Sequence, residues 1–148
     1  EIPQSPRIKD IPISGGITLN KSPIDGKGFE IYIQENALFE KAQECLRLYL
    51  ADWYADSPDS FIDDMRAPFE KVMKSYIFQN KVVAINKNFF YEPPLDYLSV
   101  CISILDEECS YVCQYSVFFD FSFEVIDDKL TAAAGIFRGI KEKRHGAN

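Results

Sequence analysis

The clearest pattern in the chain is an alternation of apolar and polar residues in the stretch CSYVCQYSVFFDFSFEVIDD, residues 109 to 128. Every odd position from Tyr111 to Val125 is apolar. The even positions between them include Gln114, Ser116, Asp120, Ser122 and Glu124. Because successive side chains of a strand point to opposite faces, the pattern predicts a long strand with one buried face and one solvated face.

A second alternating segment predicts the neighbouring strand. The turn sequence DEEC separates it from the long strand, and its apolar positions are Leu98, Val100, Ile102 and Ile104. We expect Ile104 to oppose Tyr111 and Leu98 to oppose Val117, because this register sets each apolar side chain against an apolar partner. The same register puts Cys101 and Cys113 on opposite faces, so a disulfide across this hairpin is not expected.

Two further regions complete the predicted sheet. Residues Lys81 to Tyr91 are rich in strand-forming side chains, and the pair Pro93-Pro94 ends that strand or places it at an edge. Near the N-terminus, short strands at 17–19 and 29–33 flank the turn-rich loop NKSPIDGKG. The chain is therefore predicted to contain an N-terminal hairpin and a three-stranded C-terminal meander.

Helical spacing occupies the region between the hairpin and the meander. After Asn36, a predicted N-cap, apolar residues recur at helical spacing from Leu38 to Trp53. Ser57 followed by Pro58 is the pattern of a cap and first turn, and predicts the start of the next helix.

Proline then divides the second helical stripe. Since an interior proline costs about 3 kcal/mol, Pro68 predicts one helix that ends near Arg66 and another that starts near Ala67. Gln79 and Asn80 are interpreted as the exit from that last helix.

These elements predict an α+β fold, in which an antiparallel β-sheet (N-terminal hairpin plus C-terminal meander) carries two or three helices packed on one face. At 148 residues, a single domain over 1–148 is expected. Residues 1–16 are expected to form an extended arm, the segment after Asp128 a weak helix or ordered tail, and 141–148 a mobile basic tail. The order of elements is similar to that of cystatin-like and nuclear-transport-factor-2-like folds.

Charge narrows the class of partner. The net charge is -7 and the pI is near 4.7, which disfavours nucleic acid and anionic membranes and favours a basic protein as the partner. No run approaches the roughly 20 apolar residues of a membrane helix. Four cysteines are too few for a disulfide scaffold, so reduced thiols in a cytoplasmic protein are expected. Because the chain starts at Glu1, a removed signal peptide and a periplasmic or secreted location stay open.

The motifs predict no catalytic residue, metal site or cofactor. His145, the only histidine, lies three residues from the chain end, where few neighbours can orient an imidazole. Cys109 and Cys113 lack the second pair of ligands that a structural zinc site needs, and the glycines form no phosphate-binding motif. Adjacent carboxylates are more often solvated than catalytic, and here they are Asp63-Asp64, Asp106-Glu107-Glu108 and Asp127-Asp128.

The stretch NKNFFYEPPLDYL is the candidate binding region. Its rings surround a Pro-Pro corner beside carboxylates, and such rims suit protein binding because rings anchor a partner while charges steer it. A second layer of core is the alternative interpretation of these rings. Acidic residues on the wet face of the long strand and beyond its end extend the surface. The predicted partner-binding residues are Tyr91, Glu92, Asp96, Tyr97, Asp120, Glu124, Asp127 and Asp128.

The segment Glu124 to Leu130, an xxIDDxL turn after a closing strand, resembles the immunity proteins that bacteria carry beside polymorphic or contact-dependent toxins. The resemblance spans about residues 76 to 130 of a small, acidic, aromatic-rich chain. It implies a non-enzymatic protein that neutralises a cognate toxin domain, often a basic nuclease, by occluding its active site. The alternative is a cone-shaped α+β domain that binds a small molecule or acts as an enzyme, with a pocket between helices and sheet. A third hypothesis is a secreted or periplasmic accessory domain.

Overall fold

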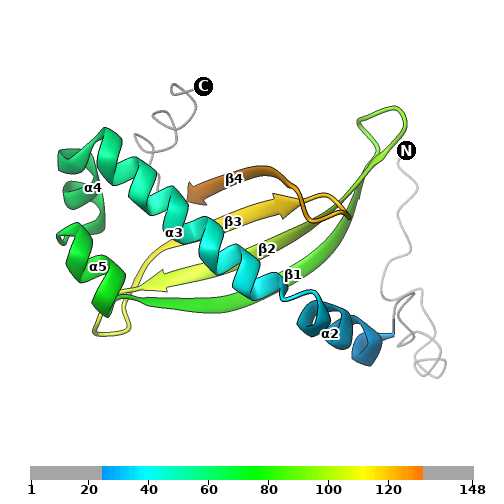
Figure 1. Cartoon of the computed structure of the whole chain (residues 1–148), viewed down its shortest axis with the longest axis horizontal. Coiled ribbons are helices and arrows are strands. Elements are labelled where there is room, and N and C mark those ends of the chain that lie inside the picture. The colour runs from blue at the N-terminus through cyan, green and yellow to red at the C-terminus, as the bar shows by residue number, and fades with distance from the viewer. Residues whose placement is uncertain (1–24, 132–148) are drawn as a thin grey trace, which may run out of the picture. The chain divides into compact units, whose positions relative to one another are not determined.

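The structure, a computed structural model, describes residues 25–131. Helix α2 belongs to an N-terminal unit that ends at Ala37, and the chain from Leu38 onward forms a second unit. The predicted arm 1–16, the strand at 17–19 and the tail 141–148 lie outside the described residues, and the single domain over 1–148 stays a prediction. The elements in chain order are α2 (Gly26–Glu35), α3 (Leu38–Asp56), α4 (Pro58–Met65), α5 (Phe69–Ser75), β1 (Ile77–Asn88), β2 (Leu95–Leu105), β3 (Tyr111–Phe119) and β4 (Val125–Thr131) (Figure 1).

The N-terminal unit corrects the first prediction. Residues 29–33 lie in helix α2, so the expected hairpin strand there is wrong. The Asp25 carboxylate accepts a hydrogen bond from the Gly28 amide at 3.1 Å, which caps the helix and starts it. Phe29, Tyr32 and Ile33 also fit helical spacing. The same residues are therefore compatible with a strand or a helix, and the cap at Asp25 favours the helix. Asn36 ends α2 instead of capping α3.

Helix α3 confirms the predicted long helix. One stripe of the helix is buried, and its members are Leu38, Ala42, Leu46, Tyr49, Leu50 and Trp53. The ring of Tyr49 meets that of Tyr115 edge-on, with centroids 5.6 Å apart. This stripe therefore seals the sheet.

Helices α4 and α5 confirm the two short helices separated by Pro68. Ser57 and Pro58 start α4, and Arg66 ends it in the left-handed conformation with φ 62°. Pro68 is the N-cap of α5, where its carbonyl accepts a hydrogen bond from the Val72 amide and an N–H would have no helical partner, so its missing N–H costs nothing. The predicted exit at Gln79 and Asn80 is wrong, because these residues already lie in β1.

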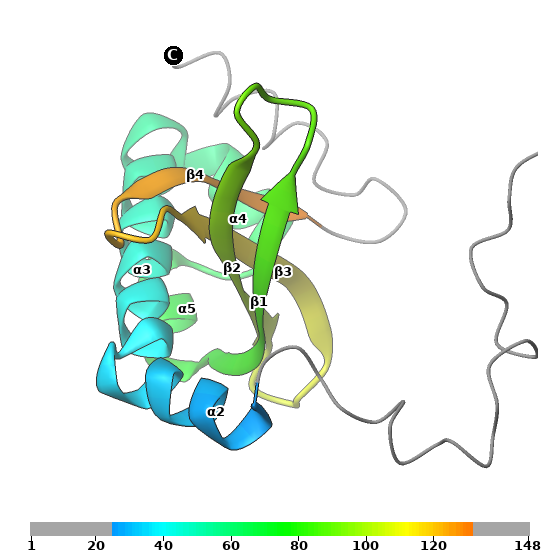
Figure 2. The same ribbon diagram turned by 90° about the vertical axis from the view of Figure 1, so that its right-hand side faces the viewer.

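The sheet is a four-stranded antiparallel meander in the order β1-β2-β3-β4, and the α+β prediction is confirmed. Helix α3 packs against β2 and β3, and α3 to α5 lie on one side of the sheet (Figure 2). The predicted inward face of β2 is confirmed, since its four side chains have no exposed area. The members of this helix-facing side are Leu98, Val100, Ile102 and Ile104 on β2, with Cys113, Tyr115, Val117 and Phe119 on β3.

The register between β2 and β3 differs from the prediction by two residues. Leu98 opposes Phe119 instead of Val117, and Ile104 opposes Cys113 instead of Tyr111. At the turn the register is already offset by one residue, since Leu105 pairs with Tyr111, and a bulge after Ile104 leaves one extra residue on β3 and adds the second. A shift of two keeps every side chain on its face, so the predicted burial holds although the pairing was wrong.

The predicted long strand is in fact two strands. β3 ends at Phe119, residues 120–124 form a turn, and β4 starts at Val125. Asp120 and Glu124 therefore lie in a turn and not on the wet face of a strand. The IDD motif predicted as a turn is strand, and so are residues 129–131, which were expected to begin a helix or tail. The meander has four strands for this reason.

The four cysteines form no disulfide. Cys101 and Cys113 lie on opposite faces of the sheet, and Cys109 lies in the β2–β3 turn with φ 66°. Burial raises the pKa of the Cys113 thiol far above its ordinary value, so this thiol stays protonated and unreactive.

The cross-strand pair of Leu98 and Ile85, whose side chains share one face, tests whether the core is centred on β2 or extends to the edge strand β1. Leu98 is fully buried, whereas Ile85 on the edge strand β1 is 41% exposed. Leu98→Ala is expected to lower the free energy of unfolding by about 2–5 kcal/mol through the cavity it leaves. Ile85→Ala should cost much less, because its side chain already contacts water. Urea denaturation measures both, and equal losses would contradict the assignment of the core.

Candidate functional site

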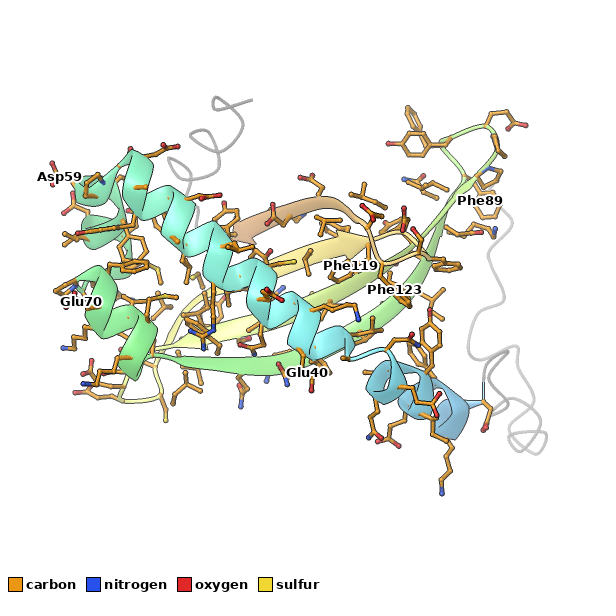
Figure 3. The ribbon with its side chains drawn as sticks, viewed as in Figure 1. Glu40, Asp59, Glu70, Phe89, Phe119 and Phe123 are labelled. Carbon is orange, nitrogen blue, oxygen red and sulfur yellow. The ribbon has the colours of Figure 1, made fainter. Side chains whose placement is uncertain are left out.

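Two hairpin loops meet at one end of the sheet. In an antiparallel meander the β1–β2 loop and the β3–β4 turn fall at the same end, and Phe89, Phe119 and Phe123 mark that end in Figure 3. Asp59 and Glu70 mark the opposite end, beside α4 and α5. The end formed by residues 88–97 and 118–128 is called the hairpin end below.

The β1–β2 loop exposes three consecutive aromatic side chains. Phe89, Phe90 and Tyr91 are 74%, 89% and 51% exposed, and the hairpin that carries them extends past the end of α3 (Figure 1). The Asn88 side-chain oxygen accepts a hydrogen bond from the Phe90 amide at 2.9 Å, which shapes the loop. The peptide bond between Glu92 and Pro93 is cis. Phe89 and Phe90 are too exposed to form a second layer of core, whereas Tyr91 is half exposed and its ring meets that of Phe90 edge-on.

The β3–β4 turn is organised by one carboxylate. Asp120 Oδ1 accepts hydrogen bonds from the Ser122 amide at 2.8 Å, the Ser122 hydroxyl at 2.6 Å and the Glu124 amide at 3.0 Å. These bonds hold the pKa of Asp120 below its ordinary value, with the Ser122 hydroxyl as the largest cause. Lys41 of α3 lies 5.3 Å from the centroid of the Phe123 ring, which ties the turn to the helix.

A small pocket lies between the two loops, on the face of the sheet opposite to α3. Its volume is ≈ 210 Å³. The ring of Phe118 meets that of Tyr97 edge-on at 5.9 Å. Lys129 Nζ stands 5.7 Å from the centroid of the Phe118 ring. The lining residues are Asn88, Tyr91, Leu95, Tyr97, Phe118, Ile126 and Asp127.

Most of the predicted partner-binding residues lie at the hairpin end. Tyr91, Tyr97 and Asp127 line the pocket together, although they come from a loop and two different strands. Glu92 is exposed in the β1–β2 loop, next to Tyr91. Asp120 and Glu124 stand in the neighbouring turn.

Two of the predicted acids are engaged inside the chain. Asp96 forms an ion pair with Lys87 at 2.6 Å. Asp128 accepts a hydrogen bond from the Tyr115 hydroxyl at 2.7 Å, on the face of the sheet that the helices cover. These two carboxylates already have partners within the chain, and a binding protein would have to compete for them.

Sequence reasoning missed several residues of this site. Phe118 and Ile126 line the pocket, and Phe121 in the β3–β4 turn is 50% exposed. Phe118 occupies an even position of the alternation, where a large ring breaks the polar pattern. That break was the available signal. Ile126 gave no such signal. It lies against the pocket because a bulge between Phe118 and Phe119 makes it an extra residue of β4, and a bulge of this kind is not visible in the sequence.

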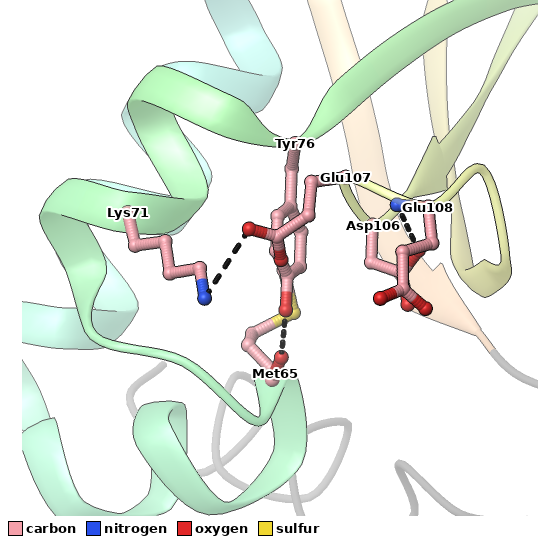
Figure 4. A network of polar contacts seen from close by, with 6 residues as sticks. All are labelled: Met65, Lys71, Tyr76, Asp106, Glu107 and Glu108. Carbon is pink, nitrogen blue, oxygen red and sulfur yellow. Dashed lines mark hydrogen bonds and ion pairs between the residues drawn. The ribbon is translucent and has the colours of Figure 1, made fainter.

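The carboxylates at the opposite end of the sheet serve the fold. Asp106 Oδ1 accepts hydrogen bonds from the amides of Glu108 and Ser110, both at 2.9 Å, and Glu107 pairs with Lys71 of α5 at 3.2 Å (Figure 4). The Tyr76 hydroxyl donates to the Met65 carbonyl at 2.7 Å. Burial, followed by these carboxylates, raises the pKa of Tyr76. The contacts join α4 and α5 to the β2–β3 turn.

The described part of the chain contains neither a cluster of metal ligands nor a helix suited to span a membrane. Within residues 25–131, no group of three or more His, Cys, Asp or Glu side chains is placed to hold a metal ion. The buried polar residues of this range are Ser103 and Ser116, neither of them ionisable. His145 lies outside it. None of the helices in the range combines the length and apolar character needed to cross a membrane.

The Asp120 carboxyl is expected to titrate below the ordinary aspartate value of 3.8. Since its folded pKa is depressed, its stabilisation of the turn is present above that ordinary value and is lost as pH falls through the folded pKa. Carboxyl ¹³C shifts measured against pH check the value, and a midpoint at or above 3.8 would contradict it. Asp120→Ala should weaken amide protection at Ser122 and Glu124 without changing that of β2.

Comparisons with family models, with curated proteins and with solved structures found no match to this chain. The resemblance to immunity proteins and the analogy to cystatin-like and nuclear-transport-factor-2-like folds therefore stay predictions.

Proposed function

We propose that this chain is a non-enzymatic binding protein that docks its hairpin end onto a basic protein, in the manner of an immunity protein that occludes the active site of a cognate toxin domain. The observation that carries the proposal is the exposure of Phe89, Phe90 and Tyr91 to solvent in a hairpin loop that also carries the exposed Glu92.

Exposed aromatic side chains of this size favour a protein partner. A soluble monomer seldom exposes contiguous apolar surface without a function, and the hairpin end adds Phe121, Val125 and Ile126, which are 45% to 50% exposed, to the three loop rings. Aromatic side chains dominate the energetics of protein interfaces because they bury a large area at a small cost in side-chain entropy. The β1–β2 loop is therefore the expected anchor.

Charge at the same end favours a cationic partner. Glu92, Glu124 and Asp127 form no ion pair with another residue of the described range, and the whole chain carries a net charge of -7. Carboxylates at the rim of an interface contribute mainly to the rate of encounter and to its dependence on salt. The carboxylates would speed association and the aromatic side chains would slow dissociation, which together suit a fast and tight inhibitor.

The enzymatic or small-molecule alternative has less support. A pocket of ≈ 210 Å³ is smaller than the roughly 300–1,000 Å³ of drug-sized ligand sites. It also lies on the face of the sheet away from the helices, whereas the alternative required a pocket between helices and sheet. No carboxylate among residues 25–131 is fully buried, and Asp64, whose pKa is raised mainly by burial, lies on α4, away from the pocket.

The gene next to the one that encodes this chain offers the direct test. The polypeptide it encodes is expected to arrest growth when expressed alone, and co-expression of this chain should restore growth and form a complex that survives gel filtration. A neighbour that is harmless and does not bind would overturn the toxin assignment.

Phe90→Ala is expected to weaken binding of that polypeptide by about tenfold or more, as the loss of an aromatic anchor does. The free energy of unfolding should not change, since the ring is 89% exposed. Leu48→Ala on α3, where the side chain is 60% exposed, is the matched control and should bind normally. Calorimetric titration measures both variants. Normal binding by Phe90→Ala would remove the loop from the interface.

Replacing Glu92 and Glu124 by Lys is expected to slow association and to flatten its dependence on ionic strength, because two steering charges change sign. Dissociation should change less than association. Stopped-flow measurements at several salt concentrations give both rates. The same double change at Asp59 and Glu70, at the opposite end of the sheet, keeps the net charge equal and serves as the control. Equal effects of the two double variants would show that net charge alone matters.

A further inference from the structure

The pocket at the hairpin end has a composition that suits one kind of side chain. Three rings, from Tyr91, Tyr97 and Phe118, surround a volume of ≈ 210 Å³, and Asp127 places a carboxylate at its edge. Leu95 and Ile126 supply the remaining apolar wall. Aromatic rings bind a cation through their faces, and a carboxylate beside them adds a charged acceptor.

The polar groups of the pocket are held in place but not saturated. Asp127 Oδ1 accepts a hydrogen bond from the Asp128 amide at 2.9 Å, which fixes the orientation of the carboxylate. Its second oxygen makes no hydrogen bond or ion pair with another residue of the range 25–131. The hydroxyl groups of Tyr91 and Tyr97 also have no protein partner within that range. Three acceptor oxygens therefore remain for a ligand.

Lys129 shows that this surface can hold a cation, and its charge would also repel a second cation in the pocket. Its ammonium group already lies 5.7 Å from the centroid of the Phe118 ring. It is not among the residues that line the pocket, so the volume itself stays open to a second group. A cation in the pocket would be repelled by Lys129 and attracted by Asp127, with Glu92 and Glu124 nearby in the two loops. Of the other lysines at this end, Lys41 contacts Phe123 and Lys87 pairs with Asp96.

We propose that the pocket receives an arginine side chain of the partner protein. The inference rests on the proposed function for the source of that side chain. A guanidinium group is planar, stacks on aromatic rings and presents five N–H donors, which matches a narrow site with rings on its walls and several acceptors. A lysine ammonium is compact and strongly hydrated, so it is less able to stack on the rings and to hydrogen-bond to the carboxylate at the same time. The pocket is also small enough for one side chain and too small for most ligands.

The test uses the full chain and needs no partner. N-acetylarginine amide, N-acetyllysine amide and N-acetylnorleucine amide are titrated separately, and the signals of Tyr97, Phe118 and the Asp127 amide are followed by NMR. The arginine probe is expected to shift these signals at millimolar concentration, the lysine probe to bind several-fold more weakly, and the norleucine probe not to bind. Equal response to all three, or no response to arginine, would overturn the inference.

Variants give the test a second readout. Asp127→Asn keeps the shape of the site and should weaken the arginine probe by about tenfold, the scale expected for a charged acceptor. Lys129→Gln should strengthen it, because a repelling charge is removed. Asp63→Asn, an exposed residue of α4, makes the same change of charge elsewhere and should leave binding unchanged. Unchanged binding by Asp127→Asn would also overturn the inference.

Failure of this inference and failure of the proposed function are distinguishable. If the arginine probe does not bind but Phe90→Ala still weakens the complex, the rings dock without an arginine in the pocket. If the probe binds but no basic partner exists, the pocket stands and the proposed function falls. With a partner in hand, a double-mutant cycle between Asp127→Asn and each partner arginine identifies the side chain that enters the pocket.

Discussion

The packing of α3 on one face of β2 and β3 is the interaction on which the rest of the structure depends. Leu46, Tyr49 and Leu50 of the helix and the inward side chains of the two central strands are buried together. Burial of apolar area of this kind is the main favourable term in folding. Because it uses one face of the sheet, the other face and the ends of the strands are left to carry small polar residues, a pocket and the two hairpin loops.

The hairpin end differs from the opposite end in how its side chains are satisfied. Near α4 and α5, Lys71, Glu107 and the Tyr76 hydroxyl find partners inside the chain. At the hairpin end, the rings of the β1–β2 loop face solvent, while the turn beside them is held by Asp120 and by the contact of Lys41 with Phe123. A loop that displays aromatic side chains from a fixed base is preorganised, so less entropy is lost when a partner binds.

The two proposals use different parts of this one end. The exposed rings of the β1–β2 loop and the carboxylates beside them would bind a basic protein. The pocket would bind one arginine side chain of that protein. Affinity and specificity would then depend on different residues. A surface built in this way can reject basic proteins that lack an arginine at the right place, which is how a dedicated inhibitor avoids other partners.

The amino-acid sequence by itself determined the helices from Leu38 to Ser75 and the side of the sheet on which each β2 and β3 residue lies, because both follow from local periodicity and from proline. It did not determine the register of β2 on β3, since a slip of two residues keeps every apolar side chain on its face. The turn at Asp120 could not be predicted, because the alternation of apolar residues continues unbroken from β3 through the turn into β4. The helix at 29–33 was wrongly predicted as a strand, because its apolar residues fit both periodicities. The pocket joins a loop to all four strands, and the bulge at Phe118 that brings Ile126 into it is a product of pairing between strands. Only the tertiary structure decides such a site, because its members are far apart in the chain and are brought together by contacts that no local pattern encodes.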